Sequence, residues 1–278
     1  MKKDEALYWQ KFEVQIQGAI DAMPGVAGLS LIDITTGHTL AVNGDEIFPT
    51  ASSIKIHILA ALLAQAEAGE IDLSAPLAAD PAQFVFGSGV LAYLEDAPSL
   101  TLRDMAILMI IASDNSATNL CIDLAGMDRV NALIQDFGLT HTHLRRKMMD
   151  NLAAVRDLEN VSTPNEMAQT LARLHAGQPT PWVGAETLRI LAKPKSGYLN
   201  QALPEDLPVA HKPGSVDAAD CDIGLVHLPR RPYIIAAMTK YATLPEPDLS
   251  RALVNLFRLI HTGMDTLDRS NSAGRTVW

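Results

Sequence analysis

A serine and a lysine stand three residues apart where the apolar segment "FPTASSIKIHILAALLAQ", residues 48–65, begins. Residues three apart lie on the same face of a helix, so the Lys55 amine can reach the Ser52 hydroxyl. A serine becomes a nucleophile when a base removes its proton, and a lysine can be that base if burial or a nearby cation lowers its pKa. The alternative is a lysine that keeps its charged end in water.

Two further short motifs follow in the chain. Ser113-Asp114-Asn115 lies at the end of the apolar run "LTLRDMAILMIIA", and a Ser or Asp there could simply cap the next helix. Lys212-Pro213-Gly214 lies in "VAHKPGSVDAADCDIGLV", where a lysine on an apolar strand followed by glycine suggests a charged group in a cleft. The alternative for this motif is an ordinary turn at a strand end.

Taken in order, the three motifs resemble the Ser-x-x-Lys, Ser-Asp-Asn and Lys-Thr-Gly motifs of the serine β-lactamase and penicillin-binding protein superfamily. The surrounding sequence is similar to that of the class A-like enzymes: "FPTASSIK", "LTLRDMAILMIIASDNSATN", "STPNEMAQTLARL" and "HKPGS…DIGLVHLP…PYIIAAMTK". The resemblance covers roughly residues 20–263. It implies the serine β-lactamase-like fold and a serine hydrolase that works without a cofactor.

The resemblance assigns a role to each residue of the first two motifs. Ser52 would be the nucleophile that accepts the acyl group, and Lys55 would help to activate it. Ser113 would pass a proton to the departing amine, and Asn115 would hydrogen-bond the substrate's side-chain amide. The expected chemistry is acyl transfer through a tetrahedral oxyanion and an acyl-enzyme.

The third motif would supply the rest of the site. Lys212 would raise the local positive potential, lower the pKa of Lys55 and face a substrate carboxylate. Gly214 and Ser215 would bind substrate, and the backbone N–H groups of Ser52 and Ser215 would form the oxyanion hole. Pro213 departs from the family's Thr or Ser and removes a strand N–H, which an edge strand can tolerate.

A second departure concerns the release of the acyl group. Class A enzymes use an Ω-loop glutamate to activate the deacylating water, and that position falls near Lys147 within "LRRKMMDNLAAVRDLENVSTP", residues 144–164. Three carboxylates in the loop are candidate substitutes: Asp150, Asp157 and Glu159. The alternative for Glu159 is a salt bridge to Arg145 at the neck of the loop.

Three functions remain open at this point. The leading one is hydrolysis of β-lactam amides through a Ser52 acyl-enzyme. A D-alanyl peptidase or esterase of the same fold is the second. The third is a penicillin-binding sensor that is acylated and stays acylated, which the missing glutamate would favour.

The order of elements predicts an α+β fold: an antiparallel sheet flanked by terminal helices, plus an all-helical lobe. We expect a sheet lobe from residues 1–50 and 205–278 and a helical lobe from 51–204, with the active site between them. Strands are expected within 26–44, 208–215, 221–229 and 232–240. Helices are expected at 4–22, 52–69, 102–112, 116–126, 128–137, 164–176, 182–192 and 247–263.

The composition of the chain limits the classes of partner that we expect it to bind. The 278 residues are 48% hydrophobic and carry a net charge of −10, which argues against nucleic acid or an anionic membrane as a partner. We expect a monomer that acts on a small molecule. The N-terminus has no apolar signal-peptide core, which predicts a cytoplasmic protein, or a periplasmic or secreted one if a signal was removed.

Cysteines and histidines add little to the chemistry. Cys121 and Cys221 could pair, but two buried free thiols are favoured because cysteine is often buried. His141 and His143 lack a third ligand at metal-binding spacing, so no metal site is expected.

Overall fold

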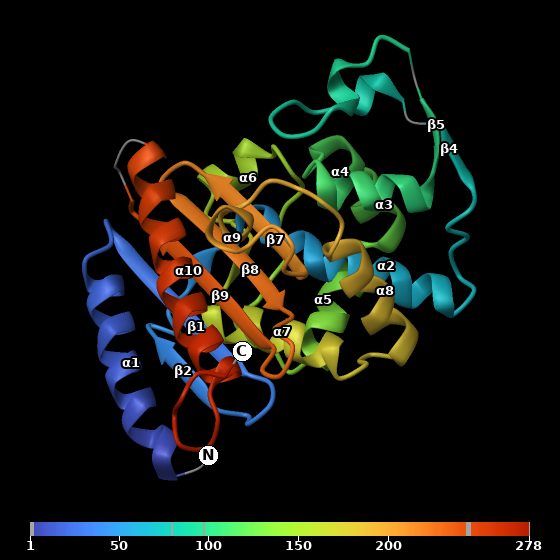
Figure 1. The fold of residues 1–278 in the computed structure, drawn as a ribbon. Coiled ribbons are helices and arrows are strands. Elements are labelled where there is room, and N and C mark those ends of the chain that lie inside the picture. Colours follow the sequence, from blue (N-terminus) through green and yellow to red (C-terminus); the bar gives the residue numbers. More distant parts are fainter. Residues whose placement is uncertain (1–2, 79, 97, 243–245, 278) are drawn as a thin grey trace. The chain divides into compact units, whose positions relative to one another are not determined.

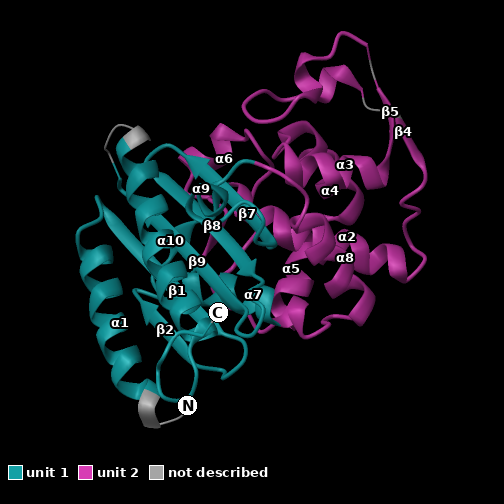
Figure 2. Cartoon of the chain, viewed as in Figure 1, with its two compact units in different colours: residues 1–51, 163–172, 196–278 teal, residues 52–162, 173–195 magenta. Residues whose placement is uncertain are grey.

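The computed structural model describes residues 3–78, 80–96, 98–242 and 246–277. The chain divides into two compact units (Figure 2). Unit 1 is Met1–Ala51, Thr163–Ala172 and Ser196–Trp278, and unit 2 is Ser52–Ser162 and Arg173–Lys195. Segments 163–172 and 196–204 thus lie with the sheet, whereas the sequence placed them in the helical lobe.

Unit 1 is built on a five-stranded sheet in the order β2-β1-β9-β8-β7 (Figure 1). Its strands are β1 (Val26–Asp33), β2 (Thr39–Val42), β7 (Val209–Val216), β8 (Ala219–Val226) and β9 (Tyr233–Lys240). All neighbouring pairs are antiparallel, with Leu29 opposite Ala237 and Lys212 opposite Ile223. The predicted fold class is confirmed, and strands from both ends of the chain form one sheet.

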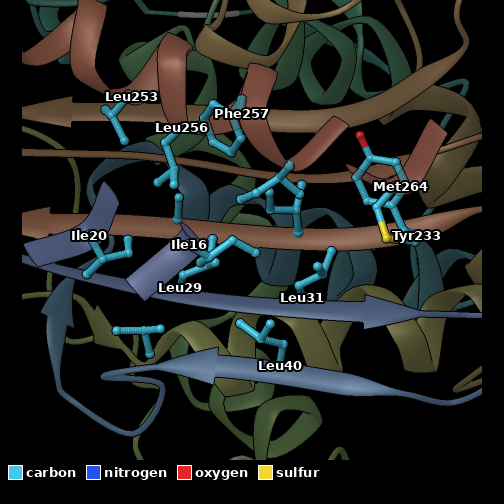
Figure 3. Close-up of a cluster of buried hydrophobic side chains, with 14 of the residues drawn as sticks. Ile16, Ile20, Leu29, Leu31, Leu40, Tyr233, Leu253, Leu256, Phe257 and Met264 are labelled. Atoms are coloured by element: carbon cyan, nitrogen blue, oxygen red, sulfur yellow. The ribbon is translucent and has the colours of Figure 1, made fainter. Parts of the chain in front are cut away.

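The terminal helices α1 (Lys3–Asp21) and α10 (Glu246–Arg269) pack on one face of this sheet. Their apolar side chains meet the alternate inward residues of β1, as Figure 3 shows for Ile16, Leu29 and Leu31. The two helices approach closely at Gly263, where a Cβ atom would lie 2.2 Å from the Phe12 ring. The alternation of apolar residues along β1 therefore explains which face of the sheet is covered.

Unit 2 is organised around α2 (Lys55–Glu67), which follows the 3₁₀ turn η1 (Ala51–Ile54). Every residue from Lys55 to Leu63 is buried. A helix that is buried on all sides needs apolar residues all round, as this segment has. The helices around it are α3 (Leu102–Ile111), α4 (Asn115–Ala125), α5 (Met127–Asp136) and α8 (Pro181–Leu191).

The eight predicted helices are confirmed with small shifts at their ends; α7 spans Pro164–His175. Short elements were not predicted: α6 (Asn151–Val155), α9 (Tyr198–Ala202), η2 (Pro81–Gln83), η3 (Leu91–Tyr93), β3 (Phe48–Pro49), β4 (Pro76–Ala78), β5 (Ser99–Thr101) and β6 (Val161–Ser162). Residues 268–278 are polar and small, which predicts a loose tail, and this prediction is wrong for the described part. Helix α10 continues to Arg269, and the Val277 N–H donates to the Arg269 carbonyl oxygen (2.8 Å).

Candidate active site in unit 2

The segment that carries Ser52 and Lys55 begins with an unusual backbone conformation. Ala51, the first residue of the 3₁₀ turn η1, has a φ of +45°, a left-handed conformation that alanine rarely adopts. Ser52 lies in this turn and is half-buried, whereas Lys55 is the first residue of α2 and has 0% exposure. Lys55 is therefore a buried lysine, and the alternative of a surface lysine is wrong.

A buried amino group, charged or neutral, needs hydrogen-bond partners to offset its lost hydration. Lys55 Nζ donates to the Ser113 carbonyl oxygen (2.7 Å), to Ser113 Oγ (3.0 Å) and to Asn115 Oδ1 (3.1 Å). All three acceptors belong to the Ser113-Asp114-Asn115 motif. The structure thus brings together two motifs that lie 58 residues apart in sequence.

The middle residue of that motif has a structural role. Asp114 is the N-cap of α4, and its Oδ1 accepts the Ala117 N–H (2.9 Å). Its Oδ2 accepts the N–H groups of Val90 (2.7 Å) and Leu91 (2.9 Å). The capping role expected at this motif is therefore confirmed for Asp114, while the Ser113 and Asn115 side chains contact Lys55.

Ser113 has a φ of +50° in the turn between α3 and α4. A non-glycine residue in this region stores backbone strain, which persists only where the surroundings enforce it. Here the strained residue directs both its carbonyl oxygen and its hydroxyl to Lys55 Nζ. Such strain is common at active sites.

The loop before β5 completes this side of the site, and the sequence analysis did not identify it. The Asn115 N–H donates to the Ser88 carbonyl oxygen (3.0 Å), and Asn115 Nδ2 donates to the Phe86 carbonyl oxygen (3.2 Å). Gly89 has a φ of +109°, and a Cβ there would lie 2.2 Å from Asp114 Oδ2. Gly89 was the available signal, since only glycine fits there.

Cys121 lies on α4, where burial and the charge of Lys55 affect the pKa of its thiol. Burial raises the pKa of its thiol to about 12, and the positive charge of Lys55 acts in the opposite direction. The thiol is therefore protonated at neutral pH and is not a competing nucleophile. Cys121 and Cys221 are both buried and do not form a disulfide, as favoured from the sequence, and Cys221 Sγ donates to the Thr50 carbonyl oxygen (3.3 Å).

Residues 144–163 form the loop in which the substitute carboxylates were sought. Glu159 is held by Arg146, whose Nε and terminal nitrogen donate to its two carboxylate oxygens at 3.0 Å each. The sequence predicted a salt bridge from Glu159 to Arg145, and this prediction is wrong: the partner is the next residue, Arg146. Asp150 is the N-cap of α6 and accepts the Ala153 N–H (3.0 Å). Asp157 is exposed with a φ of +60°.

One residue of this loop is tied to the site directly. The Met148 N–H donates to Asn119 Oδ1 (2.8 Å), and Asn119 Nδ2 donates to the Met148 carbonyl oxygen (3.1 Å). Asn119 lies one helical turn after Asn115, on the same face of α4. Met148 is thus buried beside the face that contacts Lys55, while Lys147 pairs with Asp123.

The third motif lies on β7 in unit 1. Lys212 is 1% exposed and its Nζ donates to the Pro213 carbonyl oxygen (2.9 Å); Gly214 is buried and Ser215 is exposed. Strand β7 is an edge of the sheet, which explains why Pro213 is tolerated. The convergence of Lys212, Gly214 and Ser215 with Ser52 stays a prediction.

The described residues contain no group of three or more His, Cys, Asp or Glu placed to hold a metal ion. His57, on α2, is fully buried. His211 Nδ1 lies 2.8 Å from Asp222 Oδ1, and both side chains are buried. None of the described helices is long and apolar enough to cross a membrane.

Comparisons with known sequences identify the family of the chain. Residues 11–261 match the profile of the β-lactamase enzyme family. The chain is 29% identical over 193 residues to β-lactamase CARB-4 of Pseudomonas aeruginosa, covering 68% of this chain and 67% of that one. It is 26% identical over 221 residues to β-lactamase AER-1 of Aeromonas hydrophila, covering 76% and 71%.

Solved structures show the same similarity over most of the chain. A β-lactamase from Sphaerobacter thermophilus superposes with a TM-score of 0.85 at 30% identity, over 92% of this chain and 98% of that one. The L158E mutant of PBP-A, solved as an acyl-enzyme complex with penicillin G, gives a TM-score of 0.82 at 27% identity, over 92% and 97%.

Proposed function

Because the chain belongs to the β-lactamase enzyme family, with the fold of the class A enzymes, we propose that Ser52 is acylated by β-lactams. The observation that carries this proposal is the fully buried Lys55, which is hydrogen-bonded to Ser113 and Asn115. General-base activation requires a buried amine within reach of the serine hydroxyl, and Lys55 lies three residues after the half-buried Ser52.

The proposed reaction begins at the Ser52 hydroxyl. Lys55 takes the hydroxyl proton, and Ser52 Oγ forms a bond to the carbonyl carbon of the substrate. The C–N bond then breaks, and the Ser113 hydroxyl passes a proton to the departing nitrogen. Ser113 regains a proton from Lys55, whose Nζ lies 3.0 Å from Ser113 Oγ. Water later hydrolyses the ester and restores Ser52.

Substrate binding is assigned to polar groups of the second and third motifs. Asn115 would hold the amide of the substrate's side chain, and Lys212 would supply positive potential for its carboxylate. Gly214 and Ser215 would border the acyl group, and the Ser52 and Ser215 N–H groups would bind the oxyanion. These roles rest on the sequence resemblance for the residues of β7.

We further propose that the chain lacks the Ω-loop glutamate and releases its acyl group slowly. Glu159 forms an ion pair with Arg146, Asp150 accepts the Ala153 N–H as the N-cap of α6, and Asp157 is exposed. We therefore assign none of the three as the base. Met148 is the loop residue fixed beside the Asn115 face of α4. A thioether cannot accept a proton from water, so this position offers no base. The L158E mutant of PBP-A was solved as an acyl-enzyme complex with penicillin G, which supports a penicillin-binding protein that stays acylated as the second candidate function.

Intact mass followed against time after mixing with penicillin G tests the acylation step. We expect a single adduct in the native protein, none in Ser52→Ala, and labelling slowed by orders of magnitude in Lys55→Ala. Ser74→Ala, a change at an exposed turn, is the control and should label normally. Normal labelling of Ser52→Ala would exclude the proposal.

The same experiment with released product followed in parallel tests deacylation. We expect Met148→Glu to shorten the lifetime of the adduct, because it places a carboxylate on the residue held by Asn119. Lys147→Glu is the matched comparison, because the Lys147 side chain pairs with Asp123 rather than contacting Asn119. This variant should leave the lifetime of the adduct unchanged. Rapid turnover by the native protein would contradict the slow release.

A further inference from the structure

A shallow groove lies on unit 2 at the C-terminal end of α2. Its volume is about 640 Å³, which suits a small molecule. Four of its lining residues carry charge or an aromatic ring: Glu67, Asp72, Arg103 and Trp182. We call it the Trp182 groove. Glu67 is the last residue of α2 and Lys55 is the first, so about 18 Å of helix separates the groove from the candidate active site.

Trp182 places an exposed indole in this groove. It lies in the first turn of α8, directly after Pro181, and is 40% exposed. Trp9, by contrast, is 3% exposed in the core of unit 1. The face of an indole carries negative potential and is the best aromatic partner for an ammonium ion. An exposed tryptophan that lines a cavity is therefore suited to an organic cation.

Two carboxylates line the same groove, and hydrogen bonds fix their positions. Glu67 Oε2 accepts the hydroxyl of Thr180, the N-cap of α8. Asp72 Oδ1 accepts the Ser74 hydroxyl (2.6 Å) and the Ser74 N–H (2.8 Å). These two bonds hold the pKa of the Asp72 carboxyl below its ordinary value, so it is ionised at neutral pH. The contacts use one oxygen of each carboxylate, and a ligand can bind the other.

Arg103 is the basic residue of the groove, and it is paired. Its side chain lies 3.0 Å from Glu186 Oε1, and its N–H donates to the Leu73 carbonyl oxygen (3.0 Å). Glu67 also lies at the C-terminus of α2, where the helix dipole is negative and an acidic side chain adds to it. The lining therefore has an excess of negative charge, which selects a positively charged ligand.

We propose that the Trp182 groove binds a small organic cation with a substituted ammonium group. The ammonium group lies against the indole of Trp182 and pairs with the carboxylates of Glu67 and Asp72. The volume and the indole favour an organic cation over a bare metal ion, which takes its ligands from several oxygen atoms at short range. The net charge of −10 adds a long-range attraction for cations.

The test compares choline with dimethylbutanol, the neutral alcohol in which a carbon atom replaces the choline nitrogen. Saturation-transfer NMR on the ligand methyl protons, at constant ionic strength, gives the Kd of each. We expect choline to bind roughly tenfold more tightly than the alcohol.

Two variants locate the binding. Trp182→Leu should weaken choline binding about fivefold, and so should the double variant Glu67→Gln/Asp72→Asn. Glu70→Gln is the matched control, because this carboxylate also follows α2 but pairs with Arg129 and lies outside the described lining of the groove. It should bind choline as the native protein does.

Equal binding of choline and dimethylbutanol overturns the proposal, because the groove would then recognise an apolar group. No saturable binding of choline, or binding that both variants keep, overturns it as well. Circular dichroism checks that each variant is folded, and the double carboxylate variant decides alone if Trp182→Leu is not. Sedimentation with phosphatidylcholine vesicles that Trp182→Leu abolishes would assign the groove to a lipid headgroup and overturn a free small molecule as its occupant. The result does not depend on acylation of Ser52, since choline binding is measured without penicillin.

Discussion

Replacing Asp114 by asparagine should destabilise the protein although the two side chains have the same shape. The carboxylate accepts three N–H groups, from Ala117, Val90 and Leu91, at 2.7–2.9 Å. An asparagine has one acceptor oxygen, so it can keep the two bonds to the loop only by turning its NH₂ group toward the Ala117 N–H.

The size of the effect follows from those three bonds. A hydrogen bond to a charged group contributes about 1.5–3 kcal/mol and one to a neutral group about 0.5–1.5 kcal/mol. Replacing three charged bonds by two neutral ones therefore lowers the free energy of unfolding by about 4 kcal/mol. The site lies at the start of α4, next to Asn115, so acylation should also slow.

Urea unfolding followed by circular dichroism measures the stability, and hydrogen exchange measures the two loop amides. We expect the amides of Val90 and Leu91 to lose protection first, because Asp114 is their acceptor. Asp123→Asn is the control: it lies on the same helix, is half exposed, and pairs with Lys147 at the surface. A loss below about 1 kcal/mol for Asp114→Asn, equal to that of the control, would refute the reasoning.

Further predictions concern the same unit. Gly89→Ala should cost about 2–4 kcal/mol, since its Cβ would overlap the Asp114 carboxylate at a φ of +109°; thermal unfolding measures it. Glu159→Gln should lower the free energy of unfolding by about 2 kcal/mol, because it weakens the ion pair with Arg146. Proteolysis of the loop that this pair closes should become faster, and an unchanged cleavage rate would contradict the prediction. Because burial raises the pKa of Cys121 to about 12, the folded chain keeps a proton that the unfolded chain loses above pH 9. The free energy of unfolding should therefore fall from pH 9 to 12, and iodoacetamide at pH 9 should modify the thiol only after unfolding.

The long helices could be predicted because the spacing of their apolar residues shows which side of each helix is buried. Helix α2 is the clearest case: a mostly apolar segment predicts a buried helix, and Lys55 is the charged residue within it that indicates chemistry. The first turn of this segment could not be predicted. It is 3₁₀ rather than α-helical, and it begins with a left-handed Ala51, a conformation that an alanine in the sequence does not indicate.

The sequence could not predict which backbone groups the polar side chains bind. Asp114 binds N–H groups that lie 23 and 24 residues earlier, and any residue but proline has such a group. The choice of Arg146 over Arg145 for Glu159 likewise depends on the twist of the loop between neighbouring arginines. Helix α6 has only five residues, too few to establish a period of 3.6.

The Ser113-Asp114-Asn115 motif explains how unit 2 can bury a lysine. A lone ammonium inside a helix cluster would be neutralised by a lowered pKa or excluded from the core. Ser113 turns its carbonyl oxygen toward Lys55 only because its backbone is left-handed, and that conformation is costly by itself. Asp114 offsets this cost with three hydrogen bonds that fix the start of α4 directly after the strained residue. The three side chains therefore act as a unit, in which the central carboxylate stabilises the backbone that presents its two neighbours to the lysine.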